Sequence, residues 1–238
     1  MSSIAASELT FAGGGRVRAL EVRRMPQARA MRLSVDPRDG AVRLVLPQRM
    51  ALARGLAWAE EKRGWIEGAL AALPAGRPFV DGQMLPFRGD MLTVDWSPAR
   101  PRTVRRDGGR LLAGGPTEGL ARRIERWLRA EALAVLSHET ARFADRAGLA
   151  PGPVAIGDPR SRWGSCSADG AIRYSWRLVL APPAVLEATA AHEVAHRLHM
   201  DHSPAFHAAV ARLLGREPKA ERAWLRRHGA GLHGVGRS

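Results

Sequence analysis

Histidines gather in one short stretch of the chain, and this stretch constrains the fold more than any other feature. Five of the eight histidines lie between residues 192 and 207, within the sequence AHEVAHRLHMDHSPAFH. On an α-helix His192 and His196 are four residues apart, so their rings leave the same face about 5–6 Å apart at Cβ. The spacing predicts a helix that offers two ring nitrogens to one metal ion.

The residue after the first of these histidines is an acid. His192, Glu193 and His196 form the pattern H-E-x-x-H, in which two histidines bind zinc and the glutamate accepts a proton from the zinc-activated water. Such pairs also occur by chance on helices, and the pattern alone produces false matches. The surrounding sequence favours a real site, because a strand-like segment precedes the helix and another histidine follows its end.

A catalytic zinc ion usually takes three protein ligands, and the third could be His199, His202 or His207. His199 would lie on the same helical stripe, from which three rings cannot easily reach one tetrahedral centre. His202 fits better, because residues 200–201 can end the helix and Ser203-Pro204 is typical of the N-cap and first position of another. The ten-residue spacing from the first ligand is also that of zincins whose third ligand follows a turn.

The expected site is therefore zinc on His192, His196 and His202, with Glu193 as the catalytic base. An alternative is a zinc ion that only staples two helices together. Glu193 is evidence against it, since a structural site needs no adjacent carboxylate and is normally closed by a fourth protein group. The sequence does not choose a donor for the oxyanion of the transition state; the candidates are Tyr174, Arg162, His199 and His207.

Composition limits the class of protein. A chain of 238 residues with 45% hydrophobic residues can form one large domain or two small ones. The first residues lack the regions of a secretion signal, and no apolar run approaches the roughly 18 residues of a membrane span. The single cysteine, Cys166, excludes an internal disulfide and fits a reducing compartment. We expect a cytoplasmic protein without a membrane partner.

The formal net charge of +14 raises the possibility of a nucleic-acid partner. Basic residues exceed acidic ones by 8 in residues 1–110 and by 6 in residues 111–238, so they are spread through the chain. Nearly all are arginine. A generally basic surface and a nucleic-acid site are equally compatible with this distribution.

Hydrophobic periodicity predicts an α+β fold in two parts, with a β-rich region at 16–115 followed by a zincin-like helical domain at 116–228. Flexible tails are expected at residues 1–15 and 229–238. In the first part the expected elements are strands at 17–23, 30–35 and 41–46, a turn at 36–40, a helix at 51–73 and short strands within 79–112. In the second part they are a helix at 117–147, a strand at 154–156, a loop at 160–170, a strand at 171–181, the H-E-x-x-H helix from 182–183, a helix from 203–204 and a last helix at 217–228.

The loop that contains Cys166 could supply a nucleophile or a metal ligand, since a thiolate suits zinc. Both roles are less favoured than a buried, reduced thiol that fixes the loop, because the histidines already form a coherent metal site. Support of that site from outside the ligand set is the second interpretation.

The chain carries the motifs SRWGSCS at 161–167, WRL at 176–178, APP at 181–183, H-E-x-x-H at 192–196 and HS-x-x-F at 202–206. Together they resemble the YgjP-like metallopeptidase family and, more distantly, the SprT-like proteases. The WGSCS element makes this resemblance far more specific than H-E-x-x-H alone. One departure is His207, where relatives commonly have tryptophan.

The resemblance implies zinc on His192, His196 and His202, with Glu193 catalytic. The expected function is a zinc-dependent peptidase that acts on a peptide or protein substrate. The alternative is a nucleic-acid-associated protease or DNA-binding module of the SprT type. The segment 171–181 is expected to be an edge strand against which an extended peptide could pair.

Overall fold

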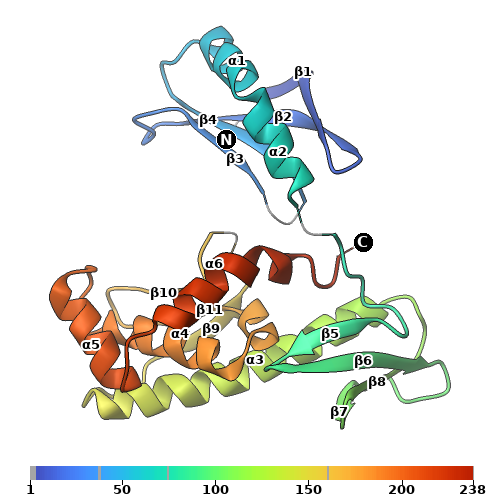
Figure 1. Ribbon diagram of the computed structural model, residues 1–238, viewed down its shortest axis with the longest axis vertical. Helices are drawn as coiled ribbons and strands as arrows, with labels where there is room; N and C mark the ends of the chain where they lie inside the picture. The colour runs from blue at the N-terminus through green and yellow to red at the C-terminus, as the bar shows by residue number, and fades with distance from the viewer. Residues whose placement is uncertain (1–3, 37–38, 74, 160, 238) are drawn as a thin grey trace. The chain divides into compact units, whose positions relative to one another are not determined.

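The computed structural model describes residues 4–36, 39–73, 75–159 and 161–237 and divides the chain into two compact units, Met1–Ala75 and Gly76–Ser238 (Figure 1). The fold is mixed α+β with a β-rich N-terminal region, as the sequence predicts. The division, however, lies before the short strands expected within residues 79–112, whereas the sequence predicts the boundary after residue 115. These strands belong to the second unit because Leu92 and Leu111 share an apolar core with Ile124 of the long helix that follows.

The first unit combines a four-stranded sheet with two helices. Its elements are β1 (Ile4–Gly13), β2 (Arg16–Met25), β3 (Arg32–Val35), β4 (Val42–Pro47), α1 (Leu52–Glu61) and α2 (Arg63–Ala71). The strands lie in the order β1-β2-β4-β3, with parallel pairing between β2 and β4. The expected hairpin is present, since β3 and β4 pair antiparallel; residues 37–38 of its turn lie outside the described residues.

Two expectations for the first unit are corrected. Residues 4–13 form β1 rather than a flexible tail, because the strand pairs with β2 and Phe11 is fully buried in the core. The single helix expected over residues 51–73 is two helices. They separate at Lys62, where ψ is 10°; its amide still donates to the carbonyls of Trp58 and Ala59, and its own carbonyl accepts from the amide of Ile66.

The second unit holds the remaining elements. They are β5 (Met84–Phe87), β6 (Asp90–Ser97), β7 (Arg105–Asp107), β8 (Arg110–Gly114), α3 (Leu120–Arg146), β9 (Val154–Gly157), β10 (Gly164–Cys166), β11 (Ile172–Ser175), the 3-10 helix η1 (Trp176–Leu180), α4 (Pro183–Ala195), α5 (Pro204–Leu214) and α6 (Lys219–His233). Helix α3 begins three residues after Thr117, with Gly119 as its N-cap in the left-handed region (φ 81°). It packs against α4 and η1 (Figure 1).

The smaller sheet of this unit has the order β10-β11-β9. Strand β11 is central, so the expectation of an edge strand at residues 171–181 is wrong. Only the first part of that segment is a strand. Ser175 ends it, because its side chain accepts a hydrogen bond from the amide of Arg177 and caps η1. The two edges of this sheet are β9 and β10, and β10 forms within the expected loop at 160–170.

The last helix extends further than the sequence predicts. Helix α6 reaches His233, and Leu232 and Val235 are buried where a flexible tail is expected. Arg177 holds this end in place. Its guanidinium donates to the carbonyls of Leu232 and Val235 at 2.8 and 2.9 Å, and to Asp158 at 2.8 Å. A buried cation thus satisfies carbonyl groups that a helix end otherwise leaves unpaired.

No helix in the described part of the chain combines the length and the apolar character that a membrane span requires.

Replacing Arg177 by methionine should lower the free energy of unfolding by roughly 3 kcal/mol, because buried carbonyls lose a charged donor and the pair with Asp158 is broken. Urea denaturation followed by circular dichroism measures the change. Arg105→Met is the control, since the Arg105 side chain is 64% exposed and pairs with Asp107, which is itself exposed; we expect it to cost about 0.5 kcal/mol or less. Equal effects of the two substitutions would contradict the role given to Arg177.

Candidate metal centre

Helix α4 carries two of the predicted ligands into the core of the second unit. It begins at Pro183, a position where proline removes no helical hydrogen bond, and most of its side chains are buried. His192 and Glu193 lie in its last turn. The helix ends at Ala195, and His196 is its C-cap with near-helical backbone angles (φ −63°, ψ −22°). The His196 amide still donates to the carbonyl of His192, so the two rings keep their expected spacing.

Three imidazole rings converge at this point. One nitrogen from each of His192, His196 and His202 lies within 4.8 Å of the other two, which makes them a group that could hold a metal ion. The Nε2 atoms of His192 and His202 are 3.4 Å apart. His202 reaches the cluster from the turn between α4 and α5. The N-cap predicted after it is confirmed, since the Ser203 side chain accepts from the amide of Phe206 and Pro204 opens α5.

A backbone carbonyl fixes the orientation of the second ring. Nδ1 of His196 lies 3.2 Å from the carbonyl oxygen of His199. Because a carbonyl can only accept, Nδ1 must carry the proton, and Nε2 keeps a lone pair for a metal. His199 therefore acts through its backbone, and its ring is outside the cluster. His207 also lies outside it, with its ring centroid 6.3 Å from that of His202.

Phe206 forms an apolar base under all three rings. It is fully buried, and its ring centroid lies 4.9 Å from His192, 4.5 Å from His196 and 4.8 Å from His202. This packing limits the rotation of the imidazoles. It explains why a phenylalanine follows the third histidine in the HS-x-x-F motif.

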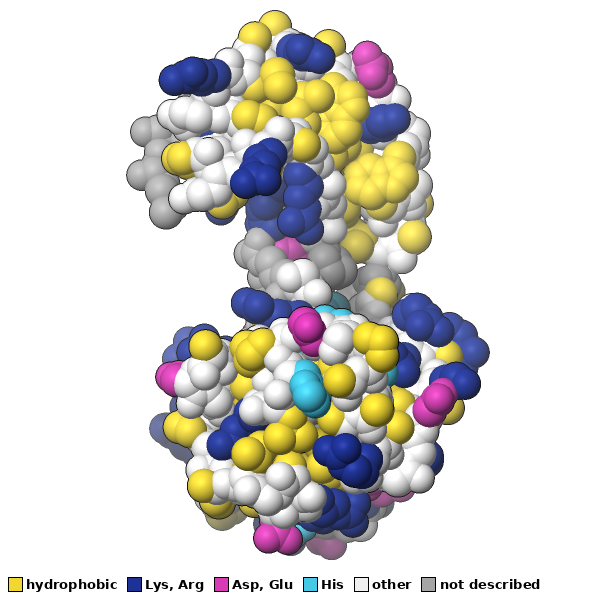
Figure 2. Space-filling model, turned by 90° about the vertical axis from the view of Figure 1, so that its left-hand side faces the viewer, with side chains coloured by type: hydrophobic (Ala, Val, Ile, Leu, Met, Phe, Trp, Pro, Cys, Tyr) yellow, Lys and Arg dark blue, Asp and Glu magenta, His cyan; other side chains and the backbone are white. Residues whose placement is uncertain are grey.

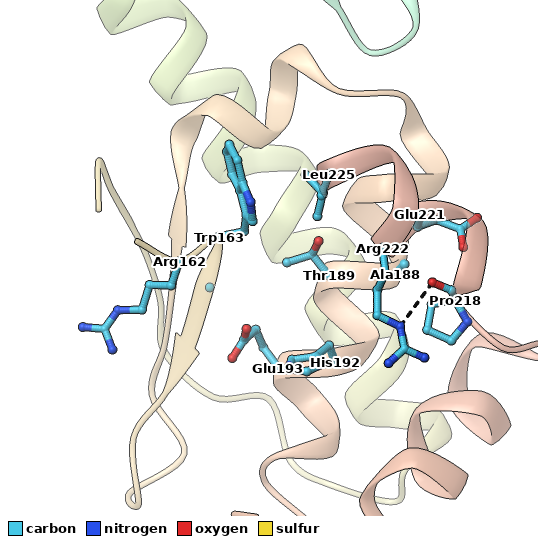
Figure 3. Close-up of a pocket in the computed structure, with 11 residues that line it drawn as sticks. Arg162, Trp163, Ala188, Thr189, His192, Glu193, Pro218, Glu221, Arg222 and Leu225 are labelled. Carbon is cyan, nitrogen blue, oxygen red and sulfur yellow. Dashed lines mark hydrogen bonds between the residues drawn. The ribbon is translucent and has the colours of Figure 1, made fainter. Parts of the chain in front are cut away.

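Glu193 is held against strand β10. Its side chain is almost fully buried, and a Cβ atom placed on Gly164 would lie 2.7 Å from both Cγ and Cδ of Glu193. No side chain larger than hydrogen fits between the strand and the carboxylate. Figure 3 shows Glu193 beside His192 on the same helix turn, below the loop that carries Trp163. The glycine of the WGSCS motif is thus needed for space.

Burial also sets the charge state of the site. Burial raises the pKa of Glu193 to about 7, and the positive charge of Arg162 opposes this shift. Burial and the neighbouring imidazoles lower the pKa of His192 to about 4, with a further contribution from Arg222. Burial also lowers the pKa of His196. Neutral imidazoles are the form that binds a metal, so the donor set fits a divalent ion such as zinc.

Two other residues singled out in the sequence lie near the site without joining the cluster. Cys166 is half-buried in β10, its thiol donates to the carbonyl of Ser167, and burial raises its pKa. These features fit a structural thiol rather than a nucleophile. Tyr174 is fully buried and its hydroxyl bonds to Thr140 at 2.8 Å, so it is not placed to stabilise an oxyanion.

Helix α6 adds residues that the sequence does not connect with the site. Arg222 and Leu225 line a pocket together with His192 and Glu193 (Figure 3). They lie about thirty residues further along the chain, and no spacing rule links them to α4. Contacts between Trp163 and α6 bring Arg222 and Leu225 to the site. A Cβ atom on Gly229 would lie 2.8 Å from the Trp163 ring, and the His233 ring stacks on the Trp163 ring with the centroids 5.3 Å apart.

A model of the YgjP-like metallopeptidase domain matches residues 29–228 of the chain. The chain belongs to the YgjP-like family. Within the first unit the match includes β3, β4, α1 and α2 and leaves out β1 and β2; within the second unit it runs to residue 228, inside α6. No curated protein and no solved structure matches the chain. Membership in a metallopeptidase family agrees with a metal held by the histidine cluster of the YgjP-like domain.

The ligand set can be tested with two alanine variants. His202→Ala should weaken zinc binding by more than about a hundredfold, since it removes a direct ligand, whereas loss of a supporting group costs about 10–100-fold. His199→Ala is the matched control and should keep zinc, because its carbonyl remains. Elemental mass spectrometry and competition with a chromophoric chelator measure both. Retention of zinc without His202 would mean that the third ligand is wrongly assigned.

The contact between Gly164 and Glu193 predicts a coupling. Gly164→Ala should destabilise the protein by about 1–3 kcal/mol through overpacking, whereas Gly109→Ala, where a new Cβ meets no atom within 4 Å, should have little effect. In a Glu193→Ala background most of the cost of Gly164→Ala should disappear. Urea unfolding of the four proteins of this cycle measures the coupling. Additive effects would show that the two residues do not compete for space.

Proposed function

We propose that this YgjP-like domain is a zinc-dependent peptidase that uses Glu193 as its general base. One observation carries the proposal: three imidazole nitrogens converge within 4.8 Å, and the carboxylate of Glu193 follows the first of them on a helix packed against a strand. A structural zinc site is usually closed by four protein ligands. Three ligands beside a buried acid are the composition of a catalytic site.

Each residue of the site has a distinct proposed role. His192, His196 and His202 would hold zinc through their ring nitrogens. When bound, zinc supplies Lewis acidity, which lowers the pKa of water and polarises the carbonyl of the scissile bond. Glu193 would accept a proton from the attacking water at its carboxylate and deliver it to the nitrogen of the leaving amine. Its pKa near 7 suits both transfers, because the group can take and release a proton at neutral pH.

Strand β10 supports a binding mode for the substrate. Among the described strands of its sheet it occupies the edge, and it passes directly beside Glu193 at Gly164. We infer that an extended peptide pairs with β10, since strand addition uses backbone groups and is compatible with many sequences. Strand β10 takes the role that the sequence suggests for residues 171–181. A pairing peptide would then run past the histidine cluster with its backbone aligned.

Glu193→Gln should reduce peptide cleavage about a hundredfold or more, because glutamine cannot accept the proton. It should leave zinc bound, since Glu193 is not in the ligand cluster. Glu187→Gln on the same helix is the control and should retain full activity, because Glu187 is partly exposed and pairs with Arg142 instead. Cleavage of a casein or proteome-derived peptide mixture, followed by mass spectrometry, gives the rates. Equal behaviour of wild type and Glu193→Gln would favour a zinc ion that only staples helices.

A further inference from the structure

A cavity of about 240 Å³ opens beside the histidine cluster (Figure 3). Three parts of the chain form it. The loop before β10 contributes Trp163, helix α4 contributes its last two turns, and helix α6 contributes the wall opposite the loop. His192 and Glu193 themselves line the cavity, so its space is continuous with the proposed reaction site.

The interior of this cavity is apolar. Trp163, Ala188 and Leu225 face it from the three elements, and each is partly or largely buried. Two of its polar neighbours have partners outside the cavity, although Oε2 of Glu221 is buried without a hydrogen-bond partner among the described residues. The hydroxyl of Thr189 donates to the carbonyl of Val185 at 2.8 Å, and the carboxylate of Glu221 pairs with Arg216 at 2.7 Å. In Figure 3 the Glu221 carboxylate turns away from Trp163 and Leu225.

Arginines lie only at the edge of the cavity. Arg222 is exposed, and its Nε lies 3.4 Å from the carbonyl of Pro218, which it donates to. The Arg162 side chain extends away from Leu225 and Trp163 (Figure 3). A basic side chain that approached the cavity would meet the positive charge of Arg222, whereas an apolar side chain would not. An acidic side chain would gain little from an exposed partner and would lose its water inside the apolar walls.

We propose that this cavity binds an uncharged, apolar side chain of leucine or phenylalanine size, at a residue that flanks the scissile bond. The inference rests on the proposed peptidase function and names the substrate class of that site. Adjacency to the bond follows from the lining, because the proposed base and a proposed ligand form one wall. Selection for size follows from the cavity volume of about 240 Å³ and from its walls at Trp163 and Leu225, since the stacking of Trp163 on His233 limits movement of the indole.

Cleavage of a proteome-derived peptide library by the zinc-loaded protein, read by mass spectrometry, tests the preference. Apolar residues should be enriched on one side of the cleaved bond, with leucine preferred over aspartate or lysine by about tenfold or more. Leu225→Trp fills the cavity and should shift the preference to alanine and glycine, and Leu225→Ala should shift it to larger aromatic residues. Leu225→Met keeps the volume and should leave the preference unchanged. A wild-type profile without apolar enrichment, or a profile that ignores both size changes at Leu225, would overturn the proposal.

A binding experiment separates this inference from the peptidase function itself. The Glu193→Gln protein is titrated with capped Gly-Ser peptides that carry a single leucine, aspartate or lysine, and NMR follows the methyl signals of Leu225 and Ala188. We expect saturable shifts with the leucine peptide and at least about tenfold weaker binding of the charged ones. If the wild type cleaves nothing but the leucine peptide binds here, the function fails and the apolar site stands. If the three peptides bind alike, the site is refuted whatever the activity.

Discussion

The contact between Glu193 and Gly164 is the constraint on which the site depends. It sets the distance between helix α4 and strand β10, because the Glu193 side chain fills the space that any larger residue at 164 would need. The same contact removes the carboxylate from water, which raises its pKa to about 7. It also places the sheet edge beside the proposed base. Packing, proton affinity and the proposed alignment of the substrate would then have one cause, and a change at position 164 should disturb all three together.

A second set of interactions fixes helix α6, which forms the wall of the cavity opposite the loop that carries Trp163. Arg177 lies in η1, directly after the central strand, and binds both Asp158 and the carbonyl groups at the end of α6. Trp163 packs against the same end of the helix through Gly229 and His233. The WRL and WGSCS motifs thus have complementary roles. Arg177 of the WRL motif anchors α6 to the sheet. Trp163 of the WGSCS motif packs on the anchored helix, and this contact holds its loop beside the histidine cluster.

The sequence could predict what depends on local spacing. The separation of His192 and His196, the cap at Ser203 and the alternation in β4 each follow from a few neighbouring residues, and each is found in the structure. Contacts between distant segments could not be predicted. The extended end of α6 depends on Arg177, some 55 residues earlier, and the roles of Gly164 and Leu225 depend on which elements pack around α4. The fully buried η1 could not be told from a strand, because all five of its residues are buried, four of them are apolar, and the segment is too short to show a helical period.

The large positive charge of the chain affects the candidate site locally, through two arginines that lie beside it. Arg and Lys side chains lie at several separate places on the face of the second unit in Figure 2, with acidic and apolar side chains between them. Two arginines act on the proposed chemistry. Arg162 lowers the pKa of Glu193 against the effect of burial, and Arg222 helps to keep His192 neutral. The charge of Arg222 opposes the binding of a cation beside His192, so the three convergent ring nitrogens must supply the affinity of the proposed metal site. The same charge favours the electron-rich carbonyl oxygen that the proposed reaction brings to this position.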